Sequence, residues 1–333
     1  LSKKISQTFV KNDMKAFVLI FGIIGVFVSS SFIRLEIFAS ISLIILSSIA
    51  LSILTKNIFK IKFSGIKNYL FKISYVIVIG FLFTLPLVYP ENSNWINNID
   101  TPPIIFTGAT NNPPTNDWLD TLEWIKLNTP ENAVIASWWD YGYWIQTLAE
   151  RTTFVDNSTL IDSRIQHMAK VLMGTPNDSW NMLKEMNADY VLVFVSAQKI
   201  NDDPEDKLYV LGGGGEESKI VWFARIAELP VEKYLEVNSV GSISTDYFDE
   251  QTLLGKMIPF TTVIYYNPDT QENSAIYKPG FVKIVSKNIE YDSDNDPLKL
   301  VYASPSFMNE KIGSMAFCLV YEVNKNYIPS NFD

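Results

Sequence analysis

The chain has 333 residues, 47% of them apolar, which is enough to bury one large core or two smaller ones. Cys318 and His167 are the only cysteine and histidine, so an intrachain disulfide, a cysteine-based zinc site and a His-rich metal site are excluded. Residues 91–333 carry 17 Lys and Arg against 34 Asp and Glu, and this negative charge argues against a nucleic-acid partner.

Three apolar stretches without a charged residue precede residue 90: residues 16–33, 37–55 and 73–89. Each approaches the roughly 20 residues that cross a bilayer, so we predict three transmembrane helices. The first is not a cleavable signal, because a second apolar stretch follows at once without a small-residue cleavage site. A buried helical hairpin in a soluble protein is the alternative.

Basic residues predict the orientation of these helices. Lysines precede the first stretch and fill the gap between the second and third: Lys3, Lys4, Lys11, Lys15, Lys56, Lys60, Lys62, Lys67 and Lys72. Basic flanks stay in the cytoplasm, so we predict a multi-pass cell-membrane protein with the part from residue 91 onward on the extracytoplasmic side. Arg34, in the outer turn between the first two helices, is either an interfacial anchor or a phosphate ligand.

The chain is expected to consist of a membrane segment, a linker and a globular domain. Residues 1–90 hold the helices, and residues 91–116, rich in Pro and Asn, form the linker. Residues 117–333 form the domain. Because the sequence begins at Leu1 without an initiator Met, and three helices carry two cytoplasmic flanks, we interpret it as a fragment of a polytopic protein.

Residues 117–333 alternate predicted helices and strands. In the helix 117–127, Trp118, Leu122 and Ile125 share one face and Asp117 can cap the start. Further helices are predicted at 143–149, 164–173 and 180–186, and strands at 133–136, 152–155 and 190–195. This alternation predicts an α/β core with a parallel sheet. Residues 137–141 and 156–159 each follow a strand, so they are expected at the ligand-binding edge of that sheet.

The C-terminal part is predicted to be richer in β-structure. Residues 221–226 begin a strand or a helix, and short β-like runs occupy 261–266, 281–285, 300–302 and 316–323. The run Gly212 to Gly215 lacks the Gly-Lys-Ser/Thr of a phosphate loop and is predicted to be a flexible loop. The segment from Asp292 to Asp296 is predicted to be a polar turn, and Asp246 to Asp249 a solvated turn.

The segment Ser137-Trp138-Trp139-Asp140-Tyr141-Gly142 is unusual for its residue types alone. Indoles supply apolar walls and N–H donors, and an ionised carboxylate accepts hydrogen bonds, so together they can hold a small hydroxyl group. A site built for a hydroxyl rejects analogues that lack it. The alternative is a structural aromatic corner in which Asp140 caps the following helix.

Trp138-Trp139-Asp140-Tyr141-Gly142 also matches the signature of the oligosaccharyltransferase catalytic subunit family (AglB/PglB-like). Residues 151–159, 189–193 and 222–227 resemble later segments of that family, and residues 32–35 resemble its arginine-containing transmembrane segment. The chain thus resembles the C-terminal portion of such a subunit, with an archaeal origin favoured. This resemblance implies a truncated GT-C-type helical membrane segment followed by a mixed α/β extracytoplasmic domain.

The resemblance implies protein N-glycosylation, in which an oligosaccharide moves from a dolichol-type lipid phosphate or pyrophosphate to the Asn of Asn-x-Ser/Thr. The partners would be the acceptor polypeptide, the lipid-linked oligosaccharide and the membrane. The resemblance implies that Trp138, Trp139 and Asp140 bind the Ser or Thr hydroxyl and that Ile165 contacts the Thr methyl. It further implies that Asp156 and Lys170 support the site as a second motif. Arg34 is implied to bind the lipid phosphate.

The resemblance also implies a Mg²⁺ or Mn²⁺ cofactor. In the family, the carboxylates that hold the metal lie in earlier external loops, and no such Asp-x-Asp motif precedes Arg34. We therefore expect no catalytic residue and no metal ligand in this chain, and no activity from the fragment alone. Two alternatives stay open: a membrane-anchored extracytoplasmic binding domain, and another polyprenyl-phosphate-sugar-dependent glycosyltransferase such as a mannosyltransferase.

Overall fold

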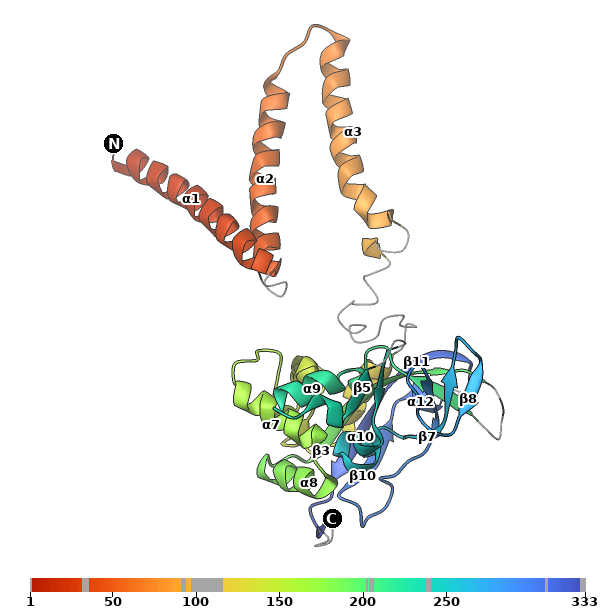
Figure 1. The fold of residues 1–333 in the computed structure, drawn as a ribbon. Helices are drawn as coiled ribbons and strands as arrows, with labels where there is room; N and C mark the ends of the chain where they lie inside the picture. Colours follow the sequence, from red (N-terminus) through yellow and green to blue (C-terminus); the bar gives the residue numbers. More distant parts are fainter. Residues whose placement is uncertain are drawn as a thin grey trace. The chain divides into compact units, whose positions relative to one another are not determined.

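The computed structural model describes residues 2–31, 36–90, 94–96, 116–201, 203, 207–237, 241–308 and 311–329. The chain forms two compact units, Leu1–Asp100 and Thr101–Asp333 (Figure 1).

The first unit is helical, with α1 at Ser2–Ser31, α2 at Glu36–Lys60 and α3 at Ile66–Val88. Two of its helices, Ile37–Lys60 and Ile66–Val88, are long and apolar enough to cross a membrane, whereas α1 has the shorter apolar segment Ala16–Ser30. Helices α1 and α2 pack closely: a Cβ atom on Gly25 would lie 3.1 Å from the Phe38 carbonyl group. The predicted helices are thus present, but among the described residues only two helices are both long and apolar enough for a membrane span.

The second unit is built on a nine-stranded sheet with the main order β10-β11-β3-β4-β9-β7-β8, and β1 joins β3 and β2 at its side. Its strands are β1 Val134–Ala136, β2 Thr152–Thr153, β3 Tyr190–Lys199, β4 Leu208–Leu211, β7 Phe260–Asn267, β8 Glu272–Ser274, β9 Val282–Lys287, β10 Leu298–Ala303 and β11 Gly313–Val323. Strands β5 Leu235–Val237 and β6 Ser242–Ser244 form a separate pair.

The prediction of a parallel sheet was right only for its first three strands. Strand β1 pairs in parallel with β2 and with β3, but β3 pairs antiparallel with both β11 and β4. The reason is that β11 comes from the far end of the chain and inserts beside β3, a pairing that local alternation does not reveal.

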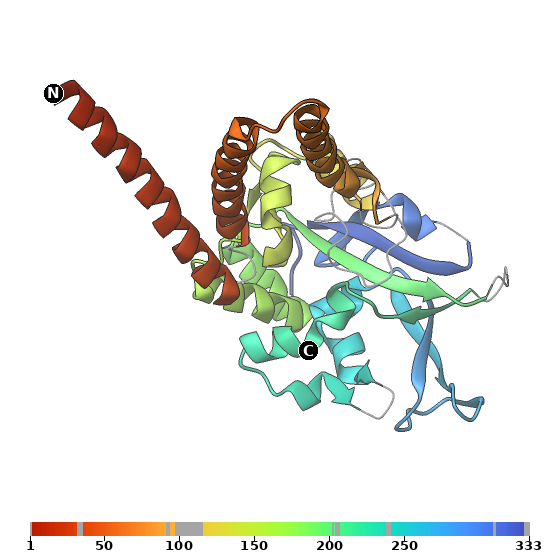
Figure 2. The same cartoon turned by 90° about the horizontal axis from the view of Figure 1, so that it is seen from above.

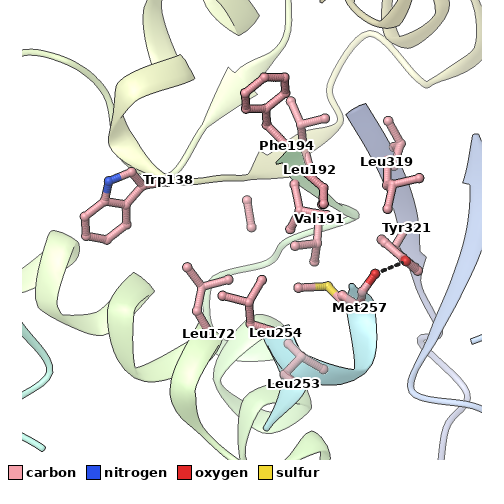
Figure 3. Packing of buried hydrophobic residues seen from close by; sticks show 14 of the residues in the cluster. Trp138, Leu172, Val191, Leu192, Phe194, Leu253, Leu254, Met257, Leu319 and Tyr321 are labelled. Carbon is pink, nitrogen blue, oxygen red and sulfur yellow. Dashed lines mark hydrogen bonds between the residues drawn. The ribbon is translucent and has the colours of Figure 1, made fainter. Parts of the chain in front are cut away.

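Residues on both faces of β3 are buried, because helices cover the sheet. These helices are α5 Asp117–Asn128, α6 Gly142–Thr147, α7 Asp162–Met173, α8 Pro176–Glu185, α9 Ile220–Ile226, α10 Asp246–Gln251, α11 Leu253–Met257 and α12 Pro305–Met308. Helix α7 contacts α8, α9 and α11, while α5 and α12 contact β11 (Figures 1 and 2). Leu172 of α7, Leu254 of α11 and Val191 of β3 meet in the apolar core drawn in Figure 3.

Two predicted polar roles were wrong. Asp117 does not cap α5; its buried carboxylate accepts hydrogen bonds from Ser304 and from Ser306 and ties α5 to the start of α12. The segment from Asp246 is the helix α10 and not a solvated turn, because the Thr245 hydroxyl accepts the Phe248 N–H at its start and Asp249 pairs with Lys283.

Candidate functional site

The Trp-Trp-Asp-Tyr-Gly motif forms the turn that follows strand β1. Trp139–Tyr141 make one 3₁₀ turn, and Gly142 opens helix α6. A Cβ atom at Gly142 would lie 2.4 Å from the Cα of Asp156 and 2.6 Å from the carbonyl oxygen of Val155. Glycine is needed here because a neighbouring backbone occupies the space of a side chain.

That neighbouring backbone is the segment after β2. Because β1 and β2 are parallel, the segments that follow them leave at the same edge of the sheet. The Asn157 side chain joins the two segments: its Nδ2 donates to the Asp140 carbonyl at 2.8 Å, and its Oδ1 accepts the Tyr143 N–H at 3.0 Å. The expectation that residues 137–141 and 156–159 both follow strands at the same edge of the sheet is therefore confirmed.

The two tryptophans of the motif have different surroundings. Trp138 is buried, with an edge-to-face contact to Phe223 of α9 at 4.7 Å between ring centroids, and it lies at the border of the core in Figure 3. Trp139 is only half-buried, and its ring centroid lies 6.2 Å from that of Trp138. The first indole thus anchors the turn in the core, and the second contributes to the accessible surface.

Asp140 is held by a residue that the sequence analysis did not select. Lys219 Nζ lies 2.9 Å from Asp140 Oδ2 and 2.9 Å from the Tyr141 hydroxyl oxygen, and it lies over the Tyr141 ring. The side chains of Lys219 and Asp140 are 18% and 32% exposed, so this ion pair is partly shielded from water. Helix α6 has no side-chain cap, so Asp140 does not act as one.

A second carboxylate, that of Glu216, interacts electrostatically with Lys219 and Tyr141. Glu216 is buried and accepts the Phe194 N–H at 2.6 Å. Burial raises its pKa, an effect that the positive charge of Lys219 partly offsets. Burial, followed by the negative charges of Glu216 and Asp140, holds the pKa of Tyr141 well above its ordinary value, so the phenol stays protonated.

One sequence signal could have revealed this group. Glu216, Glu217 and Lys219 lie between a glycine run and the apolar helix α9, and three charged residues beside an apolar helix indicate that they have partners in the folded domain. The glycines explain how the chain reaches this position: a Cβ at Gly215 would lie 2.6 Å from the Phe194 carbonyl oxygen. The glycine run that we predicted to be a flexible loop therefore leads directly into the segment that positions Lys219 beside the motif.

Asp156 and Ile165 line one small cavity of about 140 Å³. Asp156 accepts hydrogen bonds from Ser158 and, at 3.2 Å, from Gln146 Nε2. The bonds from the Ser158 side chain and backbone lower the pKa of Asp156 against the effect of burial, so this carboxylate is ionised at neutral pH. Ile165 is half-buried on α7.

The other selected residues lie apart from these contacts. Lys170 is exposed near the end of α7 and is not among the described residues that line the Asp156 cavity. Arg34 lies outside the described residues. Within the described ranges, no group of three or more His, Cys, Asp or Glu side chains could hold a metal ion.

Comparison with protein families gives this site a context. Residues 131–207, which run from β1 past β3 and include the motif and Asp156, match the STT3/PglB/AglB core domain. This stretch of the chain is therefore similar to that core domain. Lys219 and Glu216 lie just beyond the matched residues.

Curated relatives of this core domain are dolichyl-diphosphooligosaccharide–protein glycosyltransferase subunits. The STT3 subunit of Dictyostelium discoideum is 29% identical over 215 residues, which cover 61% of this chain and 30% of that protein. The STT3 subunit of Saccharomyces cerevisiae is 30% identical over 155 residues, covering 45% and 20%. The chain thus spans less than a third of the length of these relatives.

Solved structures similar to the chain include two from Archaeoglobus fulgidus. The C-terminal globular domain of an oligosaccharyltransferase matches with 17% identity and a TM-score of 0.34, covering 64% of this chain and 99% of that one. An oligosaccharyltransferase tethered to an acceptor peptide with an NVT sequon matches with 14% identity and a TM-score of 0.37, covering 92% and 46%.

Proposed function

We propose that this chain is the acceptor-recognition part of an oligosaccharyltransferase, and that its Asp140 binds the hydroxyl of Asn-x-Ser/Thr. The observation that carries this proposal is a partly exposed carboxylate fixed on one side only. Asp140 Oδ2 is paired with Lys219, whereas Oδ1 accepts no hydrogen bond from the described residues. An acceptor hydroxyl can donate to Oδ1 without displacing the ion pair.

The surroundings of Asp140 suit a hydroxyl next to an apolar group. Half-buried Trp139 offers an indole wall, and a buried Trp138 keeps the turn from shifting. The Asn157 bridge and the close approach at Gly142 fix the backbone on which the carboxylate stands. Such preorganisation favours a ligand with a hydroxyl over one with a methyl in its place, because the carboxylate would otherwise lose its solvation without gaining a partner.

The remaining assignments are part of the same proposal. Ile165 contacts the methyl group of an acceptor Thr, while Asp156 and Lys170 support the site from α7 and the segment before it. Arg34 binds the phosphate of a dolichol-type lipid-linked oligosaccharide. Residues 1–90 place the chain in the cell membrane as multi-pass helices, residues 91–116 are a linker, and residues 117–333 lie on the extracytoplasmic side. The Mg²⁺ or Mn²⁺ that assists transfer would be held by carboxylates outside the described residues.

The test is the affinity of the purified chain for matched peptides that contain Asn-x-Thr or Asn-x-Val. We expect the Thr peptide to bind about tenfold or more tightly than the Val peptide, since Val replaces the hydroxyl with a methyl. Asp140→Asn should abolish this preference. The control is Asp249→Asn, because Asp249 is also paired with a lysine and is 30% exposed.

Two results would oppose the proposal. Equal binding of the Thr and Val peptides by the parent chain would show that the chain has no site for the hydroxyl. Equal effects of Asp140→Asn and Asp249→Asn on the preference for the Thr peptide would show that the loss follows from breaking any lysine–carboxylate pair and is not specific to Asp140.

A further inference from the structure

The hairpin of α2 and α3 carries a concentrated positive charge. Residues 37–90 contain five lysines but no arginine and no acidic residue. All five lie at the end where the two helices meet, on the last turns of α2, in the connecting turn and on the first turns of α3. We call them the lysine belt: Lys56, Lys60, Lys62, Lys67 and Lys72.

The turn that carries the lysine belt is ordered by local contacts. The Phe63 N–H donates to Asn68 Oδ1 at 3.3 Å, and the rings of Phe63 and Phe71 meet edge to face at 5.1 Å. Just beyond the belt, Thr55 Oγ1 and Tyr75 Oη share a hydrogen bond of 2.6 Å between the two helices. The positive charges are therefore held on a fixed scaffold.

The lysine belt has no anionic partner within the described part of its unit. Lys56, Lys60, Lys62 and Lys67 are exposed, and no ion pair joins them to a described carboxylate. Lys72 is half-buried and lies over the Phe59 ring, 5.8 Å from its centroid. A ligand that neutralises this end of the hairpin must therefore come from outside these residues.

The dimensions of the hairpin indicate where such a ligand lies. At 1.5 Å per helical residue, Lys56 lies about 6 Å before the end of α2 and Lys72 about 9 Å after the start of α3. This depth is similar to the polar layer of a bilayer, about 5–8 Å on each side of a hydrocarbon core of about 30 Å. Past the belt, residues 37–55 rise about 28 Å and residues 73–88 about 24 Å without a charge. The belt thus coincides with the headgroup layer when the apolar parts occupy the core.

We propose that the lysine belt binds the phosphate groups of anionic phospholipids. This inference rests on the membrane placement in the proposed function, but it does not depend on which side of the membrane the belt faces. Charge complementarity selects the phosphate, and the two apolar helices select a lipid over a soluble polyanion. Exposed aromatic rings beside the ammonium groups, such as Phe63 and Tyr69, suit the interface between headgroups and acyl chains.

The experiment measures lipid preference with the full chain reconstituted in nanodiscs of phosphatidylcholine and phosphatidylglycerol. Native mass spectrometry of the released protein gives the ratio of retained lipids. Each lysine near an anionic surface contributes about fivefold to such a preference. We expect an enrichment of phosphatidylglycerol of about tenfold or more, decreasing as salt is raised.

The belt variant replaces the four exposed lysines with glutamine: K56Q, K60Q, K62Q and K67Q. The control variant removes the same charge from exposed lysines of the second unit: K126Q, K184Q, K233Q and K278Q. The belt variant should lose the enrichment about tenfold or more, and the control should keep it. A third variant, with arginine at the four belt positions, should restore the preference and shows that the hairpin still folds.

Three outcomes would overturn the inference: equal loss in the belt and control variants, no preference in the parent chain, or the same lysine-dependent retention of inorganic phosphate in detergent without lipid. Affinity for the Asn-x-Thr peptide, measured on the same proteins, separates this inference from the proposed function. The belt variant is expected to bind that peptide like the parent chain. A parent chain that enriches phosphatidylglycerol but binds no peptide would reject the proposed function and leave the lipid site standing.

Discussion

Replacing Lys219 with methionine tests whether the ion pair behind the motif positions Asp140. Methionine keeps the unbranched side chain but removes the ammonium group. The substitution therefore breaks both 2.9 Å contacts, to Asp140 Oδ2 and to the Tyr141 hydroxyl. Asp140 would then be free to rotate toward water, and the buried Glu216 would lose the positive charge that offsets its burial.

The size of the effect follows from the exposure of the pair. Fully exposed ion pairs contribute about 0.2–1 kcal/mol, and breaking a buried pair costs about 3–5 kcal/mol. With side chains 18% and 32% exposed, the pair of Lys219 and Asp140 lies between these limits. We expect the free energy of binding the Asn-x-Thr peptide to weaken by about 1–3 kcal/mol, which corresponds to roughly 5- to 150-fold weaker binding.

Isothermal titration of the Thr and Val peptides provides the assay. Lys219→Met should weaken the Thr peptide more than the Val peptide, because only the Thr hydroxyl needs an oriented carboxylate. Lys219→Arg should restore part of the difference, since it returns the charge. Lys256→Met is the matched control, because Lys256 is 27% exposed and lies 3.6 Å from Glu290.

The reasoning would be refuted if Lys219→Met retained the full preference for the Thr peptide while its unfolding showed an intact domain. A loss that was equal for both peptides would reduce Lys219 to a purely structural residue.

Three further substitutions test the geometry of the site. Gly142→Ala should lower the free energy of unfolding by about 1–3 kcal/mol or more, because its new Cβ would lie 2.4 Å from the backbone of Asp156. Gly241→Ala is the control, because its new Cβ would meet open space, and it should leave the free energy of unfolding unchanged. Equal melting temperatures of the two variants would contradict the close approach at Gly142. Asn157→Asp keeps the acceptor but loses the donor to the Asp140 carbonyl, so stability should fall by about 1–3 kcal/mol and peptide affinity with it; unchanged values in denaturant unfolding and titration would argue against the bridge. Burial raises the pKa of Glu217 to about 7, so the folded state binds this proton more tightly than the unfolded state and stability is lost as pH rises from about 4.5 through 7. Glu217→Gln should therefore gain up to about 3 kcal/mol relative to the parent chain between pH 4.5 and 8, and parallel stability curves over that range would exclude the shift.

Local sequence patterns predicted the first half of the globular domain well. The helix face of Trp118, Leu122 and Ile125 is buried, and the strand predicted at residues 190–195 is the start of β3. These predictions succeeded because the spacing of apolar residues reports directly on one buried helix face or on a strand buried on both sides. The motif was recognised because its residues are adjacent in the chain and match a family signature.

Contacts between distant segments could not be predicted in this way. Lys219 is 79 positions from Asp140, and no spacing rule joins two single charges across such a distance. Strand β11 likewise takes its place beside β3 only when the chain folds, so the antiparallel character of the sheet was missed. The helix at Asp246 was a different case, because Thr245 before an acidic first turn is a start signal that the sequence does contain.

Asn157, Ser158 and Thr159 spell an acceptor sequence of the kind that the chain is proposed to recognise. In the folded domain, the amide nitrogen of Asn157 is committed to the Asp140 carbonyl and its oxygen to the Tyr143 N–H. A sugar on that nitrogen would push apart the two segments that build the site. A chain that carried a sugar on this asparagine before folding would therefore lose the bridge between the two segments, so the native turn requires an unmodified Asn157.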